Sequence, residues 1–372
     1  MRPMTKAVSI SAVVIAASVA VIFLALPFLM TMVPDGFDED ELNAPSISYD
    51  PDIVNWTAPE AVSAPGEDHS LRWWVTPAYS DFGGVINITM ENTGNTKLHV
   101  YRMGIIWPDH GLESYRDVDV NVSIGRTADL GIIVYRAPSN VSEANYILVL
   151  YIEARNGLNS RWWDYGAMYT PEYEMDILPL GDDRSYEVTS NPTRYFNKVG
   201  SLVDFDDVQS IADGLRGGYA TYDIQQVIAV FDWVKLNIEY VDDPNDDWQS
   251  PSETLSLGGG DCEDQAMLVA SLVGALGGNA RVNLIEGHAF ATVFIGSDAS
   301  IVDDMTEAVI SHYGTDLSVF YIEDSFGIWM IVDTTSYQYC GGMPTLSVPT
   351  GTGPNDFAFE ETDYLYAVDV VG

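Results

Sequence analysis

The sequence GGGDCEDQA, at residues 258–266, places a cysteine between a run of glycines and an apolar segment that continues to Leu276. The apolar segment predicts a helix over Cys262–Leu276. A thiol at the start of a helix lies near the positive end of the helix dipole and near unpaired backbone N–H groups, and both favour the thiolate. The structural alternative is a buried cysteine behind Asp261, with Asp261 capping the helix.

Helices precede this segment and strands follow it. Apolar residues at helical spacing predict helices over 203–215 and 224–238. Extended runs then occur at 280–285, 289–295, 317–322, 328–332 and 364–371, with a helical insert around 303–312. This order is typical of an α+β domain, which we place at residues 183–372.

Two polar side chains in the strand region can complete a site with Cys262. His288 lies at the head of the strand in GHAFATVF, at residues 287–294, where a ring nitrogen can reach a thiol on a facing helix. Asp333 ends the apolar strand at 328–332, and a carboxylate there is costly unless it is paired. A cysteine on a helix start, followed by a histidine and an aspartate on strands, is the order of a thiol-nucleophile triad. The structural alternatives are a hydrogen-bonded core histidine and a strand-end cap.

These segments together resemble a known family. The blocks WQSP (248–251), ETL (253–255), GGGDCEDQA, GHAFATVF and IVDTT (331–335) look like the transglutaminase-like superfamily, which has a papain-like fold. The similarity covers about residues 200–340. The motif order resembles archaeal and bacterial transglutaminase-like cysteine proteinases more than animal crosslinking enzymes. The resemblance implies that Cys262 is the nucleophile, His288 the general base and acid, and Asp333 the carboxylate that orients His288.

The sequence departs from that family between the histidine and the aspartate. Family members separate the two by little more than a hairpin, whereas 45 residues separate His288 from Asp333 here. Asp298 is nearer in sequence and is the alternative third member. We favour Asp333, because it ends an apolar strand in the family-like IVDTT context. The insert at 296–327 is a candidate flap over the cleft.

The backbone N–H of Cys262 is expected to contribute to an oxyanion hole, together with Trp248 or Gln249. Both residues carry donors and lie shortly upstream in the sequence. The alternative for Trp248 is a packing anchor. The second cysteine, Cys340, is interpreted as structural, because a disulfide with Cys262 would abolish the nucleophile.

The motifs imply no cofactor, but three acids, Asp261, Glu263 and Asp264, lie beside the nucleophile. Some bacterial members of the superfamily that resemble this motif bind calcium near such acids, and hard cations prefer carboxylate oxygens. Asp261 and Glu263 are therefore calcium candidates. The alternative is that these charges complement the helix dipole.

The N-terminal segment at residues 7–33 contains no charged side chain and is long enough to span a hydrocarbon core of about 30 Å. Arg2 and Lys6 precede it and acids follow it, so the positive-inside rule places residues 1–6 in the cytoplasm. A cleaved signal peptide is the alternative, but no A-x-A-like site precedes Pro34. We predict a single-pass signal anchor in the cell membrane, with the C-terminal domains extracellular.

The region between the anchor and residue 182 has two parts. Residues 34–67 are acidic and carry prolines, and we interpret them as a stalk. Short β-rich runs then recur at 71–75, 84–90, 97–107, 118–124, 130–135, 146–152 and 173–178. This spacing predicts an all-β sandwich of immunoglobulin-like architecture over residues 68–182. We expect it to be a spacer or an adhesion module.

The composition sets limits on function. The chain has 16 Lys+Arg against 55 Asp+Glu, a formal net charge of −39. Because nucleic-acid affinity depends on neutralising phosphates with Lys and Arg, this charge argues against a nucleic-acid partner. High acidity keeps a protein soluble in strong salt, so we expect a halophilic source. The alternative is an acidic surface in an ordinary extracellular medium.

The sequence therefore predicts a cell-surface thiol enzyme that acts on protein or peptide amides through a thioester on Cys262. The acceptor is either water or an amine, and the nearer motif resemblance favours hydrolysis. The alternative class is an inactive transglutaminase-like scaffold that serves as a surface binding or adhesion module.

Overall fold

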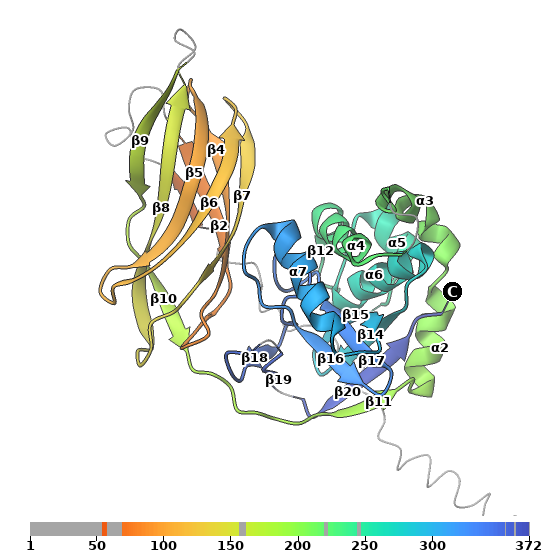
Figure 1. The fold of residues 1–372 in the computed structure, drawn as a ribbon. Coiled ribbons are helices and arrows are strands. Elements are labelled where there is room, and N and C mark those ends of the chain that lie inside the picture. The colour runs from red at the N-terminus through yellow and green to blue at the C-terminus, as the bar shows by residue number, and fades with distance from the viewer. Residues whose placement is uncertain are drawn as a thin grey trace, which may run out of the picture.

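Figure 1 shows the computed structural model of the protein, which describes residues 54–57, 69–155, 161–218, 222–243, 247–353, 355–360 and 362–371. A β-rich body formed by the earlier residues lies on the left of the view, and a body of helices packed on a sheet lies on the right. A single extended segment after β10 (Tyr173–Leu178) leads from the first body to the second.

The β-rich body consists of two sheets that enclose one apolar core. The first sheet has the order β1 (Val54–Thr57), β2 (His69–Val75), β4 (Gly84–Asn92) and β7 (Thr127–Tyr135). The second has the order β3 (Ala78–Tyr79), β10, β8 (Glu143–Arg155), β5 (Lys97–Trp107) and β6 (Leu112–Val122), with β9 (Trp162–Tyr169) beside β8. Alternate residues such as Ile86 and Ile88 of β4 and Leu98 and Val100 of β5 are fully buried between the sheets.

Two findings concern the segments before this body. Strand β1 pairs antiparallel with β2, so Val54–Thr57 belongs to the sandwich although we expected the whole of 34–67 to be a stalk. The other residues of that segment, and the expected anchor at 7–33, lie outside the described residues. Within the described ranges no helix has both the length and the apolar character needed to cross a bilayer.

The second body is an α+β domain built on a six-stranded sheet. The strand order is β11 (Glu187–Ser190), β20 (Tyr364–Asp369), β14 (Ala280–Ile285), β15 (His288–Gly296), β17 (Gly327–Val332) and β16 (Tyr321–Asp324). Helices α2 (Thr193–Leu202), α3 (Phe205–Leu215), α4 (Ile224–Asn237), α5 (Pro251–Leu257) and α6 (Cys262–Leu276) precede β14 in the chain. Helix α6 packs directly on β14 and β15.

Helix α6 is the centre of this domain. Every residue from Cys262 to Val273 is buried, as is Leu276, so the helix has no solvent-facing side. A helix that is apolar on all sides is typical of a core element that other elements cover. Helices α3, α4 and α5 cover it on the side away from the sheet. The N-terminus of α6, where Cys262 lies, is thus fixed by packing along the whole helix.

The glycine run before Cys262 has local structural causes. Gly258 ends α5 in the left-handed conformation, with φ of 68°, which glycine adopts at low cost. Gly259 and Gly260 form β13, which pairs with β12 (Glu239–Tyr240). A Cβ on Gly260 would lie 2.7 Å from the Cβ of Asp264. The run therefore allows the chain to turn tightly from α5 into α6.

The insert between β15 and β17 is directed toward the sandwich. Its helix α7 (Ile301–Tyr313) packs on α4, and Arg116 of β6 donates hydrogen bonds to the carbonyl oxygens of Tyr313 and Ile132, both at 2.6 Å. The expected strand at 317–322 is wrong in its bounds, because β16 begins only at Tyr321. The backbone N–H of Tyr321 donates a hydrogen bond to the side-chain oxygen of Asn355. The insert thus contacts the sandwich domain through Tyr313, whereas we considered it a candidate flap over the cleft.

The domains share an apolar junction. Trp74, Val85 and Ile132, from the first sheet of the sandwich, pack into the core of the α+β domain. The rings of Trp74 and Tyr337 meet edge to face with centroids 6.3 Å apart. Buried apolar contact of this kind favours a fixed relative orientation of the two domains over free swinging.

Candidate active site

His288 and Asp333 form the best-defined pair of the candidate site. His288 begins β15, and Asp333 directly follows β17, which pairs antiparallel with β15. His288 Nε2 lies 2.8 Å from Asp333 Oδ2, and both side chains are almost completely buried. The neighbouring strands thus bring together two residues that the insert separates in the sequence.

Asp333 is held as a carboxylate. Its Oδ1 accepts hydrogen bonds from the backbone N–H and the hydroxyl of Thr335, and its Oδ2 accepts the backbone N–H of Thr345 as well as His288. Burial alone would raise the pKa of Asp333, but the charge of His288 and these hydrogen bonds hold the pKa at about 2. An ionised carboxylate can only accept, so Nε2 of His288 carries a hydrogen in this pair.

The remaining ring nitrogen of His288 is available for chemistry. Nδ1 is buried and has no hydrogen-bond partner among the described residues. Since Nε2 carries the hydrogen, Nδ1 of the neutral ring holds a lone pair. A buried base with an open lone pair fits the role that the sequence predicts for His288.

Cys262 lies next to this histidine. The backbone N–H of Ala289, the residue after His288, donates to the Cys262 sulfur, which places the thiol against the start of β15. The thiol is only 1% exposed, and its Sγ lies 3.3 Å from Glu263 Oε2. The structure therefore brings Cys262 of α6 to the start of β15, beside the pair that His288 forms with Asp333.

The charge state of the thiol differs from our expectation. We expected the helix N-terminus to favour the thiolate. Instead, burial raises the pKa of Cys262 well above its ordinary value, and the charges of Glu263 and Asp261 raise it further. The hydrogen bond from Ala289 acts in the opposite direction but is weaker. Burial, together with the neighbouring acids, therefore favours the neutral thiol.

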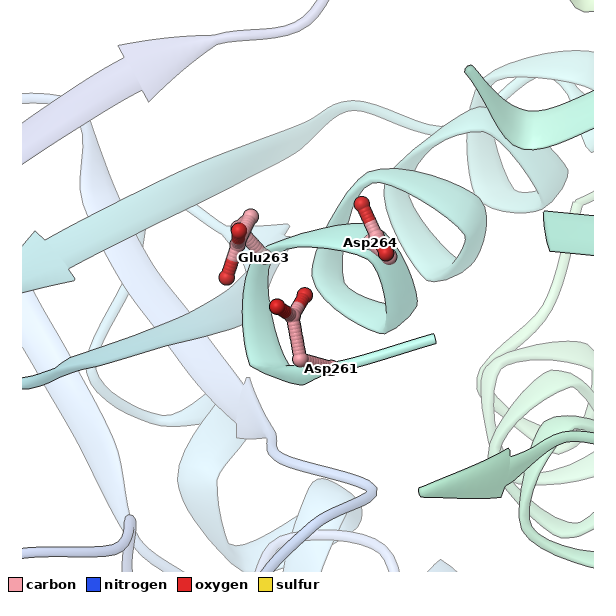
Figure 2. Close-up of side chains that lie close together, drawn as sticks. All are labelled: Asp261, Glu263 and Asp264. Atoms are coloured by element: carbon pink, nitrogen blue, oxygen red, sulfur yellow. The ribbon is translucent and has the colours of Figure 1, made fainter. Parts of the chain in front are cut away.

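Those acids form the cluster of Figure 2: Asp261, Glu263 and Asp264 lie around the first turn of α6, with one carboxylate oxygen of each within 4.8 Å of the others. All three are at most 2% exposed. Asp261 is the N-cap residue of α6, and the backbone N–H of Asp264, three residues on, acts to lower the pKa of its side chain. One oxygen of each acid has no partner among the described residues.

Hydrogen bonds from the chain offset only part of the cost of ionising this acid cluster. Burial raises the pKa of Asp261, Glu263 and Asp264, and their mutual charges raise the first two further. Three buried carboxylates with unpartnered oxygens are the donor set that a hard cation such as Ca²⁺ prefers. The residues present therefore fit a divalent cation.

The two oxyanion candidates, Trp248 and Gln249, lie directly before Ser250, the N-cap residue of α5. Trp248 is 7% exposed, its ring stacks on Tyr195, and the ammonium group of Lys198 lies over it. The indole Nε1 of Trp248 has no acceptor among the described residues. Gln249 donates its backbone N–H to Asp264 Oδ1 at 2.7 Å. Trp248 is thus both a packed residue and a buried donor that is open for a ligand.

Two other residues lie away from the chemistry. Asp298 is exposed and accepts the backbone N–H of Ser300 before α7, so it does not contact His288 and the alternative third member is not supported. Cys340 is buried and forms no disulfide with Cys262. Sequence reasoning missed Thr345, because nothing in the sequence marks a backbone donor 12 residues beyond Asp333. Thr335 had a signal, since a threonine two residues after an aspartate suits a side-chain-to-backbone turn.

Comparison with known proteins adds to this geometry. The sequence model of the Transglutaminase-like superfamily matches residues 209–333. No curated protein matches the chain. Among solved structures, a provisionally assigned cysteine protease from Cytophaga hutchinsonii is 12% identical over 86% of this chain and 90% of its own, with a TM-score of 0.25. A provisionally assigned protease from Parabacteroides distasonis is 9% identical over 61% of this chain and 62% of its own, with a TM-score of 0.23.

A protein from Archaeoglobus fulgidus is 9% identical over 33% of this chain and 94% of its own, with a TM-score of 0.18. Such TM-scores are too low to support a conclusion, so the assignment rests on the sequence match. Residues 209–333, which contain Cys262, His288 and Asp333, belong to the transglutaminase-like superfamily.

Proposed function

We propose that the protein is a thiol hydrolase that cleaves protein or peptide amide bonds through a thioester on Cys262. The observation that supports this most is a pair of contacts that adjacent residues join. The Ala289 N–H binds the Cys262 sulfur, His288 immediately precedes Ala289, and the far nitrogen of His288 binds Asp333. This arrangement suits a nucleophile, a base and an orienting acid.

In the proposed reaction, Nδ1 of His288 takes the proton from the Cys262 thiol as sulfur attacks the carbonyl carbon of the substrate. The carbonyl π-electrons move to oxygen and give a tetrahedral oxyanion. Collapse expels the amine, which receives the proton from His288, and leaves a thioester on Cys262. Water, deprotonated by the same nitrogen, then releases the acid and restores the thiol. Asp333 keeps the hydrogen on Nε2 throughout.

The oxyanion has two donors within this proposal. Cys262 is the first residue of α6, and the first backbone N–H groups of a helix have no intrahelical acceptor. The indole N–H of Trp248 is the second, as it is buried and open. Two fixed donors aimed at a developing negative charge stabilise it more than they stabilise the neutral carbonyl.

We further propose that a calcium ion binds the acid cluster, through Asp261, Glu263 and Asp264. When bound, its positive charge would offset the acids that raise the pKa of the Cys262 thiol. The chain itself supplies the ligands and the closed surroundings, and His288 remains the proton acceptor. The proposal accounts for the unpartnered carboxylate oxygens beside the nucleophile.

The location proposed for this activity is the outer face of a cell membrane, with residues 7–33 as the anchor and proteins or peptides as substrates. The uncharged 27-residue stretch and the flanking charges support it. Fusing a reporter to either end and testing protease access in intact cells would check it, and a C-terminal reporter that stays protected would contradict it.

A second function, an inactive scaffold, is favoured by one observation: the thiol is almost fully buried and its pKa is raised. Alkylation with iodoacetamide at neutral pH, in a Cys340→Ala background with Cys262 as the single thiol, separates the two. The hydrolase requires labelling in the folded state that calcium accelerates and that a further His288→Ala substitution slows. Labelling only in denaturant would support the scaffold.

A further inference from the structure

Lys235, in the last turn of α4, extends toward the back of the candidate active site. Its Nζ donates a hydrogen bond to the carbonyl oxygen of Thr334 at 2.8 Å. Thr334 directly follows Asp333, so the lysine binds the backbone of the turn that carries the catalytic carboxylate. The sequence contains only four lysines, and a cation turned inward is costly unless a charge or acceptor compensates it.

The same turn is also bound by α6. The hydroxyl of Thr334 donates to Gln265 Oε1 at 2.8 Å, and Gln265 Nε2 donates to the carbonyl oxygen of Gly260 at 3.1 Å. Thr334 therefore lies between Lys235 of α4 and Gln265 of α6, the helix that begins with Cys262. Any displacement of this turn moves Asp333 relative to both His288 and the nucleophile.

The electrostatic surroundings of Lys235 single out Asp333. Among the described residues, no carboxylate lies within 4.0 Å of the lysine Nζ. The charge of Asp333 nevertheless favours its protonated form and partly offsets the burial that lowers its pKa to about 8. Lys235 and Asp333 thus interact through space, with the Thr334 peptide between them.

Other titratable groups face the lysine across the domain junction. A cavity of about 500 Å³ between the domains is lined by Lys235, by Asp232 of the same helix, by Asp129 of β7 and by His312 of α7. Asp232 accepts hydrogen bonds from His312 Nε2 at 2.8 Å and from the Tyr313 hydroxyl at 2.7 Å. These contacts tie Asp232 to α7, whereas Lys235 is turned to Thr334.

We propose that Lys235 is a positioning residue that fixes the turn bearing Asp333 and lends it a positive charge opposite His288. The inference rests on the proposed function, because it assigns Lys235 a role in tuning that triad. With Lys235 charged, Asp333 is shared between two cations, which limits how strongly it holds a proton on His288. Without this charge, the ion pair between Asp333 and the imidazolium form of His288 would be stronger, and that form cannot accept the proton of the Cys262 thiol.

The test is the pH dependence of Cys262 alkylation in the full chain, in the Cys340→Ala background and without any substrate. Lys235→Met should move the acid limb of the rate profile to higher pH by about half a unit or more. Lys235→Gln can keep a hydrogen bond to Thr334 and should show the same shift, whereas Lys235→Arg should retain the wild-type limb. Lys97→Met, which removes an exposed charge on the sandwich, is the matched control.

An acid limb unchanged in both Lys235→Met and Lys235→Gln, with folding verified by circular dichroism, would overturn the role of Lys235 while leaving the triad intact. A slower reaction with an unshifted limb would likewise reduce Lys235 to a structural residue. If His288→Ala leaves the alkylation rate unchanged, the proposed function is refuted, and the role of Lys235 is refuted with it.

Discussion

His288 Nε2 and Asp333 Oδ2 lie 2.8 Å apart although 45 residues separate them in the chain. The antiparallel pairing of β15 with β17 produces this proximity, and the intervening insert forms α7 and β16 without disturbing it. A buried pair of this kind is sensitive to the loss of either partner, because the other group is left without compensation.

Removing members of this constellation should affect activity to different extents. We expect Cys262→Ala and His288→Ala to abolish peptide cleavage, and Asp333→Asn to lower kcat by about 10²–10⁴, since the amide no longer fixes the tautomer of His288. Single-turnover assays on a cleaved peptide measure this. Cys340→Ala is the matched control, since it removes the other buried thiol, and full activity of Cys262→Ala would refute the mechanism.

Acidification should destabilise the fold through Asp333. Its folded-state pKa of about 2 lies below the value of about 4 in the unfolded chain, so the folded state favours the carboxylate. The stabilisation is fully present above pH 4 and is lost as the pH falls toward 2, amounting to about 2 kcal/mol. Urea unfolding of wild type and Asp333→Asn between pH 5 and 2 checks this, and parallel curves would contradict it.

The acid cluster should give the opposite pH dependence in the metal-free protein. Because the pKa values of Asp261, Glu263 and Asp264 are raised by folding, their contribution is greatest below about pH 4 and declines as the pH rises through the folded-state values. Millimolar Ca²⁺ should raise Tm at neutral pH, and Glu263→Gln should reduce that rise. Equal Tm shifts with Mg²⁺ or in the variant would argue against a calcium site.

Two glycines should respond in opposite ways to alanine. A Cβ at Gly260 would lie 2.7 Å from Asp264 Cβ, so Gly260→Ala should cost about 1–3 kcal/mol and weaken the calcium response. Gly214 lies within α3 with open space around it, so Gly214→Ala should stabilise by up to about 1 kcal/mol. Chemical denaturation of the two variants measures the contrast, and a neutral Gly260→Ala would show that the first turn of α6 can shift.

The net charge of −39 should make the fold depend on salt. The Debye length grows from about 3 Å at 1 M to about 10 Å at 0.1 M, so repulsion between surface acids increases on dilution. If the protein belongs to a halophile, helical circular dichroism and thiol reactivity should fall as KCl is lowered from molar concentrations. Unchanged signals in dilute buffer would count against that origin.

Much of the local structure was predictable from the sequence. The bounds predicted for α6, β14, β5 and β10 agree with the structure residue by residue, because hydrophobic periodicity and flanking turn residues act over a few positions. The same local patterns located Cys262, His288 and Asp333 at the ends of their elements. Element ends are recognisable from the sequence, and candidate side chains often lie there.

The tertiary structure determined the environment of those side chains. Whether Asp298 or Asp333 meets His288 depended on strand pairing across an insert, and β1 and the donor Thr345 had no local signal. The sequence alone suggested an activated thiol, whereas burial and the carboxylates of Asp261 and Glu263 raise the pKa of Cys262. Sequence patterns reflect interactions within a few residues, but desolvation and charge coupling depend on which distant groups share a closed space.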